Sequence, residues 1–256
     1  MMLKAFSKKL LKAFVAAVFW IFVWYISAKY VGKDLLLPSP KAVFIRLCEI
    51  AATKDFYVTT ANSLVRISCG IIIATLTGII LAVIAHVSRI LRVLIRPLMT
   101  VIKATPVASF IILALVWLDR GSLPIFISLL MVLPVVWTNL CEGLNQIDPQ
   151  LLQLVKVYKV GFFRRISGIY IPSVFPYFTS AVKTSMGLAW KAGIAAEVLA
   201  VPARSIGKEL FNAKSYFETT DLFAWTIIVI LLSLVIELIF EALVAFGRRG
   251  GYVNIK

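Results

Sequence analysis

Residues 62–86 read NSLVRISCGIIIATLTGIILAVIAH, an apolar run with a small residue at every fourth position from Gly70 to Ala82. A transmembrane helix needs about 20 predominantly apolar residues, so this run is long enough to cross a bilayer. Lipid gives helices no hydrophobic reason to associate, and small residues at helical spacing let two backbones approach closely. The stretch therefore predicts a membrane-spanning helix that packs along one small-residue face.

The rest of the chain has the same character. Of its 256 residues, 61% are hydrophobic and 15% are charged, and the mean hydropathy is +0.96. Soluble domains average roughly 45–50% apolar and 25% charged residues. This composition excludes a cytosolic enzyme and a secreted disulfide scaffold. Cys48, Cys69 and Cys141 lack the spacing of a metal or redox motif, and the single histidine, His86, leaves little room for a histidine-based metal site.

Six runs are long and apolar enough to span a membrane. They lie at about residues 10–29, 62–86, 97–118, 122–141, 174–200 and 222–246. The first follows four lysines and resembles a signal peptide, but a cut after Ala28 would place Ile26 at the −3 position, where isoleucine is poorly suited. We therefore expect an uncleaved anchor and an all-α integral membrane protein with six transmembrane helices.

The basic residues predict the orientation of the chain. The net charge is +15, and the Lys and Arg residues flank the apolar runs, which indicates contact with membrane lipid rather than nucleic acid. With the N-terminus inside, the inner segments carry 14 of the 27 basic residues and the outer segments nine. Because positive charge favours the cytoplasmic side, we expect both termini in the cytoplasm.

A second small-residue face lies in the fifth run. Ala181, Ser185, Ala189 and Gly193 recur at every fourth position, and Glu197 extends the same face. Two interpretations are open. The face packs neighbours within one subunit, or it meets a second subunit or lines a path.

Charged residues inside the apolar runs are the strongest functional signal. Each costs at least about 2.5–3.5 kcal/mol at the bilayer centre. Glu237 and Glu241 lie one turn apart toward the inner end of the sixth run. Lys–Glu pairing between helices, or snorkelling of the charges at the helix ends, would be a structural explanation, and a water-accessible path through the bundle would be a functional one. The candidate path residues are Lys103, Thr105, Lys183, Gly187, Lys191 and Glu197.

A long inner loop follows the fourth run. Residues 148–172 read DPQLLQLVKVYKVGFFRRISGIYIP. Leu151, Leu154, Val155 and Tyr158 have i, i+3, i+4, i+7 spacing, which predicts a short amphipathic helix over 150–158, and Gly161 then permits a turn. Such a helix either lies on anionic headgroups or docks to a protein partner.

Counted back from Pro172, this segment resembles the EAA loop of binding-protein-dependent ABC importer permeases. That loop reads Glu-Ala-Ala, three residues, Gly, nine residues, then Ile-x-Leu-Pro. Here Ile169 and Pro172 keep the ending, the glycine position falls on Lys159, and the Glu-Ala-Ala positions fall on residues 153–155, Gln-Leu-Val. The spacing is kept, whereas the acidic residue and the glycine are not.

Other segments are similar to the nitrate, sulfonate and taurine branch of that family. They are Arg96-Pro97 through Thr105-Pro106, GLAWK at 187–191, AAEVL at 195–199, Ile206-Gly207 and LFAW at 222–225. The likeness covers about residues 58–246 and is specific as a set. It divides the chain into an anchor and outer segment (1–57), a permease core (58–246) and a cytoplasmic tail (247–256).

The resemblance implies a type I ABC importer transmembrane domain in a prokaryotic inner or plasma membrane. A second permease subunit, as a homodimer, two cytoplasmic ATPase subunits and an extracytoplasmic solute-binding protein would be its partners. The inner helix would be the cytoplasmic coupling helix that seats in the ATPase, through Gln150, Leu151, Gln153, Leu154, Val155, Tyr158, Lys159 and Gly161. The chain has no GxxxxGK[ST] phosphate loop, so ATP and Mg would bind the ATPase subunit, and this chain would hold no cofactor.

The function implied is import of a small solute such as a sulfonate, taurine, nitrate or a thiamine-precursor pyrimidine, without bond chemistry in this chain. An ion-gradient-driven secondary transporter is the alternative, with Lys183, Lys191 and Glu197 as ion sites. An intramembrane enzyme needs a nucleophile–base pair, a metal set or paired acids at membrane depth, and it is disfavoured because the single histidine lies at the end of a run and no paired Asp occurs.

Overall fold

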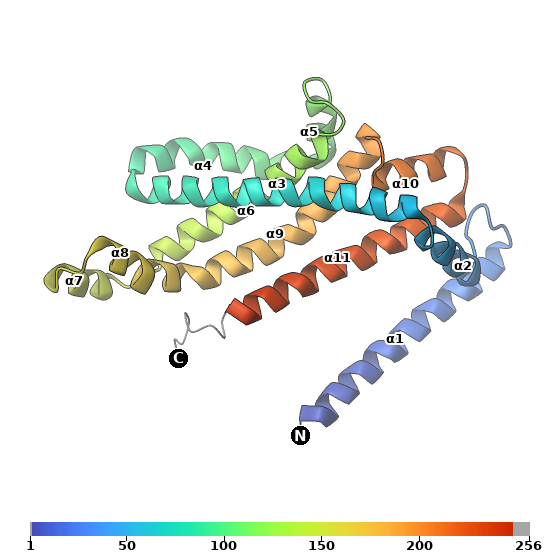
Figure 1. Cartoon of the computed structure of the whole chain (residues 1–256), viewed down its shortest axis with the longest axis horizontal. Helices are drawn as coiled ribbons and strands as arrows, with labels where there is room; N and C mark the ends of the chain where they lie inside the picture. The colour runs from blue at the N-terminus through green and yellow to red at the C-terminus, as the bar shows by residue number, and fades with distance from the viewer. Residues whose placement is uncertain (1, 248–256) are drawn as a thin grey trace.

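The computed structural model describes residues 2–247, with side chains described from 15 to 246, and this part of the chain is helical without strands (Figure 1). The helices are α1 (Met2–Val31), α2 (Pro40–Ala51), α3 (Lys54–Val87), α4 (Arg89–Ala104), α5 (Val107–Ala114), α6 (Leu123–Asn145), α7 (Pro149–Val157), α8 (Phe162–Arg165), the π-helical turn η1 (Ile166–Tyr170), α9 (Ile171–Ala200), α10 (Ile206–Ser215) and α11 (Thr219–Gly247). Side-chain caps begin several of them: Thr53 Oγ1 accepts from Phe56 N–H at α3, and Asp148 Oδ1 accepts from Gln150 N–H at α7.

The centre of the bundle is α6, which packs against both α3 and α9. The small-residue face of α3 makes this contact. A Cβ added to Gly70 would lie 2.4 Å from the carbonyl oxygen of Ile125, and one added to Gly78 would lie 2.9 Å from Val136 Cγ1. The prediction that this face packs against another helix is therefore confirmed.

The small-residue face of α9 also packs inside the chain. Ala181, Ser185 and Ala189 are buried. A Cβ added to Gly193 would lie 2.6 Å from the side chain of Ile67 and 2.8 Å from Ser128 Oγ. Of the two interpretations of this face, packing within one subunit is confirmed.

One predicted span is wrong as a single helix. Residues 97–118 divide between α4, which already begins at Arg89, and α5, and the two helices meet at an angle of 101°. Proline has no N–H and disfavours a helical residue before it, and Thr105, which precedes Pro106, is extended with φ −79° and ψ 131°. The pair is one broken span or a re-entrant segment.

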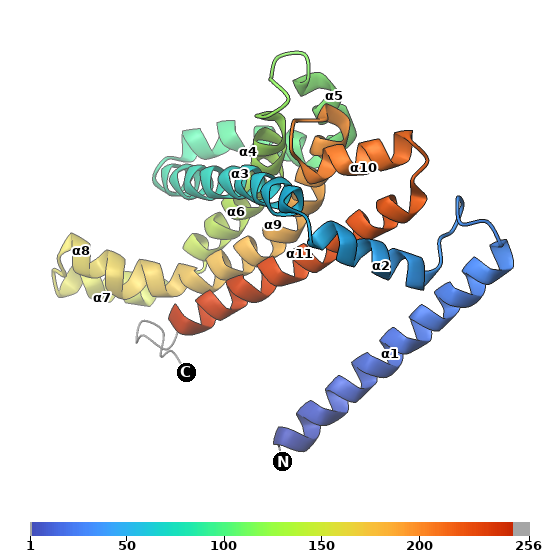
Figure 2. The ribbon, with the colours of Figure 1, turned by 45° about the vertical axis from the view of Figure 1, so that its right-hand side comes forward.

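The helices alternate in direction, as the predicted topology requires. In Figures 1 and 2 the α3–α4 turn and the α7–α8 segment lie at one end of the bundle, hereafter the α7 end. The helices α2 and α10 lie at the opposite end, hereafter the α10 end. The predicted inner loops thus share one end, and which end faces the cytoplasm stays a prediction.

Length and composition identify α3, α6 and α11 as helices able to span a membrane, and the bent α4–α5 pair as a fourth. The spanning roles of α1 and α9, and hence the total of six, stay predictions. Figure 2 shows α1 running apart from the bundle. Trp24, in the C-terminal part of α1, joins this helix to the rest of the chain. The Trp24 ring stacks on Phe223, and its Nε1 donates to the Pro38 carbonyl at 3.1 Å.

The predicted boundary at 57/58 falls inside a helix. α3 runs without a break through the boundary at 57/58. The tail beyond residue 247 lies outside the described residues.

The amphipathic stretch after Pro38-Ser39-Pro40 forms α2, and Arg46 joins it to α11 through two hydrogen bonds with Asp221, of 2.6 and 2.8 Å. These bonds and one to Glu49 raise the pKa of Arg46 further above its ordinary value.

Candidate functional site

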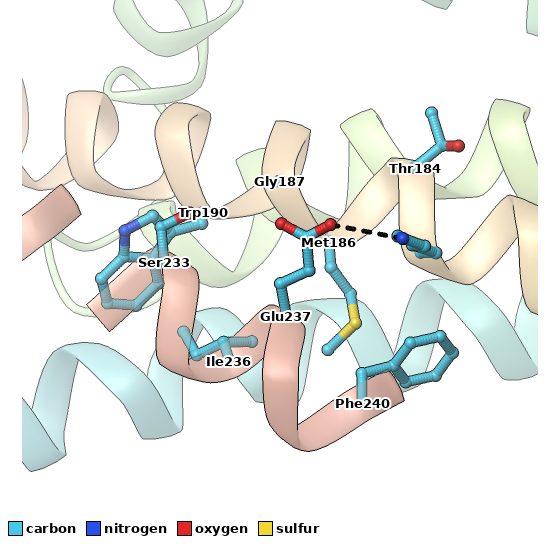
Figure 3. Close-up of a pocket in the computed structure, with 9 residues that line it drawn as sticks. Thr184, Met186, Gly187, Trp190, Ser233, Ile236, Glu237 and Phe240 are labelled. Atoms are coloured by element: carbon cyan, nitrogen blue, oxygen red, sulfur yellow. Dashed lines mark ion pairs between the residues drawn. The ribbon is translucent and has the colours of Figure 1, made fainter. Parts of the chain in front are cut away.

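A pocket of about 340 Å³ lies between α9 and α11. Its wall combines charged, polar and apolar groups: Lys183, Thr184, Met186, Gly187, Trp190, Ser233, Ile236, Glu237 and Phe240. Figure 3 shows Glu237 extending from α11 toward α9 and a dashed line that marks an ion pair. The two helices are held together nearby by Trp190, whose Nε1 donates to the Val229 carbonyl at 3.0 Å.

Lys183 is paired with two glutamates across this pocket. Its Nζ lies 3.6 Å from Glu237 Oε1 and donates a hydrogen bond to Glu241 Oε1. The exposed fractions of the three side chains are 46%, 52% and 49%. The Lys–Glu pairing that the sequence suggested is present, but the cluster is half open rather than enclosed. Charges in this state are unfavourable against hydrocarbon, so the pocket faces water or another protein surface when the chain is in a membrane.

The open side of α9 continues from this pocket. Lys191 is exposed, and no ion pair to it occurs among the described residues. Gly187 lies between the two lysines, and a Cβ added there would have no neighbour within 4 Å. Lys183 and Gly187 therefore line the same pocket, and Lys191 lies exposed one turn further along α9.

Lys103 and Thr105 lie elsewhere, at the end of α4. Lys103 Nζ donates to Thr138 Oγ1 at 2.8 Å and so joins α4 to α6. Thr105 Oγ1 donates to the Val101 carbonyl at 2.8 Å within its own turn. The structure does not bring these two residues to the α9–α11 pocket, and their role in a path stays a prediction.

Glu197 is the most enclosed of the predicted path residues, with no exposed surface. Its Oε2 accepts from Ser63 Oγ at 2.7 Å and from Gly207 N–H at 3.2 Å. Its Oε1 lies 3.5 Å from Arg66 Nη1. The carboxylate thus joins α3, α9 and α10, an arrangement that supports a structural role, and its place in a path stays a prediction.

The predicted amphipathic helix in the inner loop is α7, which begins one residue earlier than expected, at Pro149. Leu151, Leu154 and Tyr158 are exposed, as a docking surface requires, but Val155 is buried against its own chain. Val157, which the spacing did not select, is 75% exposed. The exposed apolar face of α7 therefore includes Val157 and excludes Val155, so it is rotated from the expected one.

The turn after α7 is made by Lys159 rather than Gly161. Lys159 has a left-handed backbone with φ 46°, whereas Gly161 has φ −62° and ψ 151°, which other residues adopt readily. The expectation that Gly161 permits the turn is wrong. Lys159 occupies the position at which the EAA pattern has glycine, and a left-handed residue after a helix is the usual reason for glycine there.

Two parts of these sites were missed in the sequence. Ser63 accepts from Ile206 N–H at 3.0 Å while it donates to Glu197, so it links the start of α10 to α3. Gly207 was noted only as part of a motif. Ser63 could have been found, because it is a polar residue within the apolar run 62–86 and lies two helical turns before Gly70. The contact between Glu197 and Gly207 has no such local signal in the sequence.

Curated proteins similar to this chain are transport permeases. The nitrate import permease protein NrtB of Synechococcus elongatus is 27% identical over 75% of this chain and 72% of its own length. The formylaminopyrimidine transport permease protein ThiX of Halalkalibacterium halodurans is 23% identical over 65% of this chain and 67% of its own.

The fold is also found in a solved structure. A chain of the bacterial alginate ABC transporter, crystallised with an alginate pentasaccharide-bound periplasmic protein, matches with a TM-score of 0.60. The match covers 91% of this chain and 93% of that one, at 14% sequence identity. Residues 74–248, more than half of the chain, match the family described as binding-protein-dependent transport system inner membrane component.

Proposed function

Because this chain belongs to the family of binding-protein-dependent transport system inner membrane components, we propose that it is the permease subunit of an ATP-driven importer. It would form the path for a small solute that a solute-binding protein delivers. The proposal follows the similar proteins, which are transport permeases rather than enzymes. ATP would be bound and hydrolysed, with Mg, on separate ATPase subunits.

The Lys183–Glu237–Glu241 cluster is the observation that carries the proposal. Three half-exposed charges within helices of a membrane protein require water or protein around them. We infer that a second copy of the chain meets this side of α9 and α11 and that the two copies enclose a hydrated path. The unfilled region at Gly187 leaves room for a solute to pass.

The solute class follows from how the two lysines differ. The charge of Lys183 is offset by two carboxylates. Lys191 has no acid within ion-pair distance among the described side chains, so it is the cation available to a passing anion. This favours a small oxyanion such as nitrate or a sulfonate, and a pyrimidine of the kind carried by the ThiX system is the second candidate.

We propose that α7 is the coupling helix. Leu151, Leu154, Val157 and Tyr158 give it an apolar surface that is 42–75% exposed, at the end of the bundle that holds the predicted inner loops. Burying one such side chain in an ATPase groove would contribute roughly 1.5–3 kcal/mol. ATP-driven closure of the ATPase dimer would then move α7 and, through α6 and α9, open the path to the other side.

The test is reconstitution of the permease with its ATPase and binding protein. Binding-protein-stimulated ATP hydrolysis and solute uptake in proteoliposomes support the proposal. The double variant Leu154→Asp with Tyr158→Asp should lose the ATPase on purification, whereas Lys156→Gln with Lys159→Gln, on the same segment, should retain it. Uptake driven by an ion gradient without any ATPase would show a secondary transporter instead, and dependence on the two lysines alone would place α7 on lipid headgroups.

Orientation belongs to the same proposal. Both termini and the α7 end would be cytoplasmic in the inner membrane, as the excess of basic residues favours. Reporter fusions near Lys208 and after Lys256 should then report opposite sides. Fusions that report one side would show that α11 does not cross the membrane.

A further inference from the structure

An apolar groove of about 650 Å³ opens at the α7 end, away from the charged pocket. Its walls come from the end of α3, the end of α6, the segment α8–η1 and the start of α9. Ile79, Val83, Leu140, Val174 and Phe178 are among the side chains that line it. In a membrane protein, a groove with such walls holds either another helix or a lipid chain.

Three polar side chains line this groove: Arg165, Tyr170 and His86. Arg165 Nη2 donates to the Tyr170 hydroxyl at 2.7 Å, and its guanidinium carbon lies 5.2 Å from the centre of the same ring. Tyr170 thus holds the guanidinium at the groove, where no carboxylate lies within 4 Å of it among the described residues. His86 also lines the groove, and its buried Nδ1 has no hydrogen-bond partner in the described part of the chain.

The sequence around the groove is basic and interfacial. Arg164 is adjacent to Arg165, Lys159 lies six residues before it, and Arg89 lies just after the end of α3. No acidic residue occurs in the sequence between Asp148 and Glu197. Phe162, a groove residue, and Phe163 are 69% and 84% exposed. Tyr170 also lines the groove, and tyrosine is one of the two aromatic residues enriched at the headgroup level of a bilayer. Basic pockets between helices at this level suit the phosphate of an anionic lipid.

We propose that this groove binds an anionic phospholipid of the adjoining leaflet, with one acyl chain along the apolar walls and the phosphate at Arg165. The site adjoins η1 and α8, which connect α7 to α9. A bound lipid would therefore brace the segment between the inner loop and the bundle. The inference rests on the membrane location of the chain and does not depend on which solute it carries.

Arginines 164 and 165 provide a matched test, because they are neighbours with equal charge and only Arg165 lines the groove. The full chain, purified in detergent with the subunits that accompany it, is titrated with phosphatidylglycerol and with phosphatidylcholine of the same acyl chains, and bound lipid is counted by native mass spectrometry. We expect Arg165→Gln to weaken phosphatidylglycerol binding at least fivefold, and Arg164→Gln to change it less than twofold. Val83→Trp, which fills the groove, should weaken both lipids.

Three results would overturn the proposal. Equal losses in the Arg164 and Arg165 variants would mean diffuse surface charge, and unchanged binding in Val83→Trp would mean that no acyl chain enters the groove. Phe22 of α1 is 58% exposed. A disulfide between Val83→Cys in one copy and Phe22→Cys in another would show that α1 of a second copy fills the groove. Arg165→Gln leaves the apolar walls intact, so the test stands even if Val83→Trp fails to fold.

Discussion

Glu197 and Gly207 are in contact at the α10 end, and they lie so close together that there is no space for a side chain at position 207. A Cβ built on Gly207 would lie 2.2 Å from the Cβ of Glu197, and the Gly207 N–H donates to the carboxylate at 3.2 Å. The return that brings them together passes through Val201 and Arg204, both with left-handed backbone. The close approach requires glycine, and the hydrogen bond adds a second link, so α10 is fixed to the end of α9 at this position.

Gly207→Ala should therefore destabilise the chain by about 3 kcal/mol, at the upper end of the cost of overpacking, because backbone must move to admit the methyl group. Thermal unfolding in detergent measures the effect. Gly187→Ala is the matched control within α9: its Cβ meets nothing within 4 Å, and removing a glycine from a helix interior should raise stability by up to about 1 kcal/mol. Equal shifts for the two variants would contradict the packing of α10.

Ser63→Ala should cost about 2–4 kcal/mol of stability. The hydroxyl serves two partners, Glu197 Oε2 as donor and Ile206 N–H as acceptor, and a buried group left without its partner costs about 1–3 kcal/mol. A double-mutant cycle with Glu197→Gln checks the mechanism. The two changes should be less than additive because they remove one shared interaction, and strict additivity would separate Ser63 from the carboxylate.

How much of this could be predicted from the sequence depends on the range of the interaction. The apolar runs and the small-residue faces predicted α3, α6 and α11 and the packing of α9, because helical periodicity is local. The break at Pro106 follows from a local rule, the effect of proline on the residue before it, whereas hydropathy alone predicts one continuous helix. The Glu197–Gly207 contact was not predictable, because it depends on the path of the chain through a loop with two left-handed residues.

Lys159→Gly should stabilise the connection after α7. Lys159 holds φ 46°, a conformation that costs a residue with a Cβ roughly 1–2 kcal/mol and costs glycine nothing comparable. We expect a gain of about 1 kcal/mol, smaller than this cost because glycine also loses more entropy on folding. Lys156→Gly, inside α7, should have the opposite sign and lose about 1 kcal/mol. Hydrogen exchange of the α7 amides measures both, and a loss of protection in the Lys159 variant would contradict the left-handed assignment.

Glu209 on α10 should make stability depend on pH. Burial raises its pKa, and the nearby carboxylates of Asp55 and Asp221 add to the rise while Lys208 opposes it. An acid whose folded pKa is raised destabilises the fold as pH rises from the unfolded pKa, near 4.3, through the folded value. Glu209→Gln should therefore unfold at a higher temperature than the wild type at pH 7.5, and the two should converge toward pH 4. A gap that stays constant with pH would assign the effect to packing instead.

Lys191 provides the sharpest test of the hydrated path, because the exposed side of α9 faces water, lipid or another protein surface in the assembled complex. In a background without the three native cysteines, Lys191→Cys should react with a small charged thiol reagent, since thiolate forms in water and the reagent does not enter hydrocarbon. Ala189→Cys, two residues away on the fully buried face, should stay inert and so report any loosening of the bundle. If the path alternates between two sides, the rate at 191 should also change when ATP and vanadate trap the complex. A cysteine at 191 that is inert in every state would mean that lipid or another protein surface covers this face, and it would remove the path from α9, even though the Lys183–Glu237–Glu241 cluster would remain.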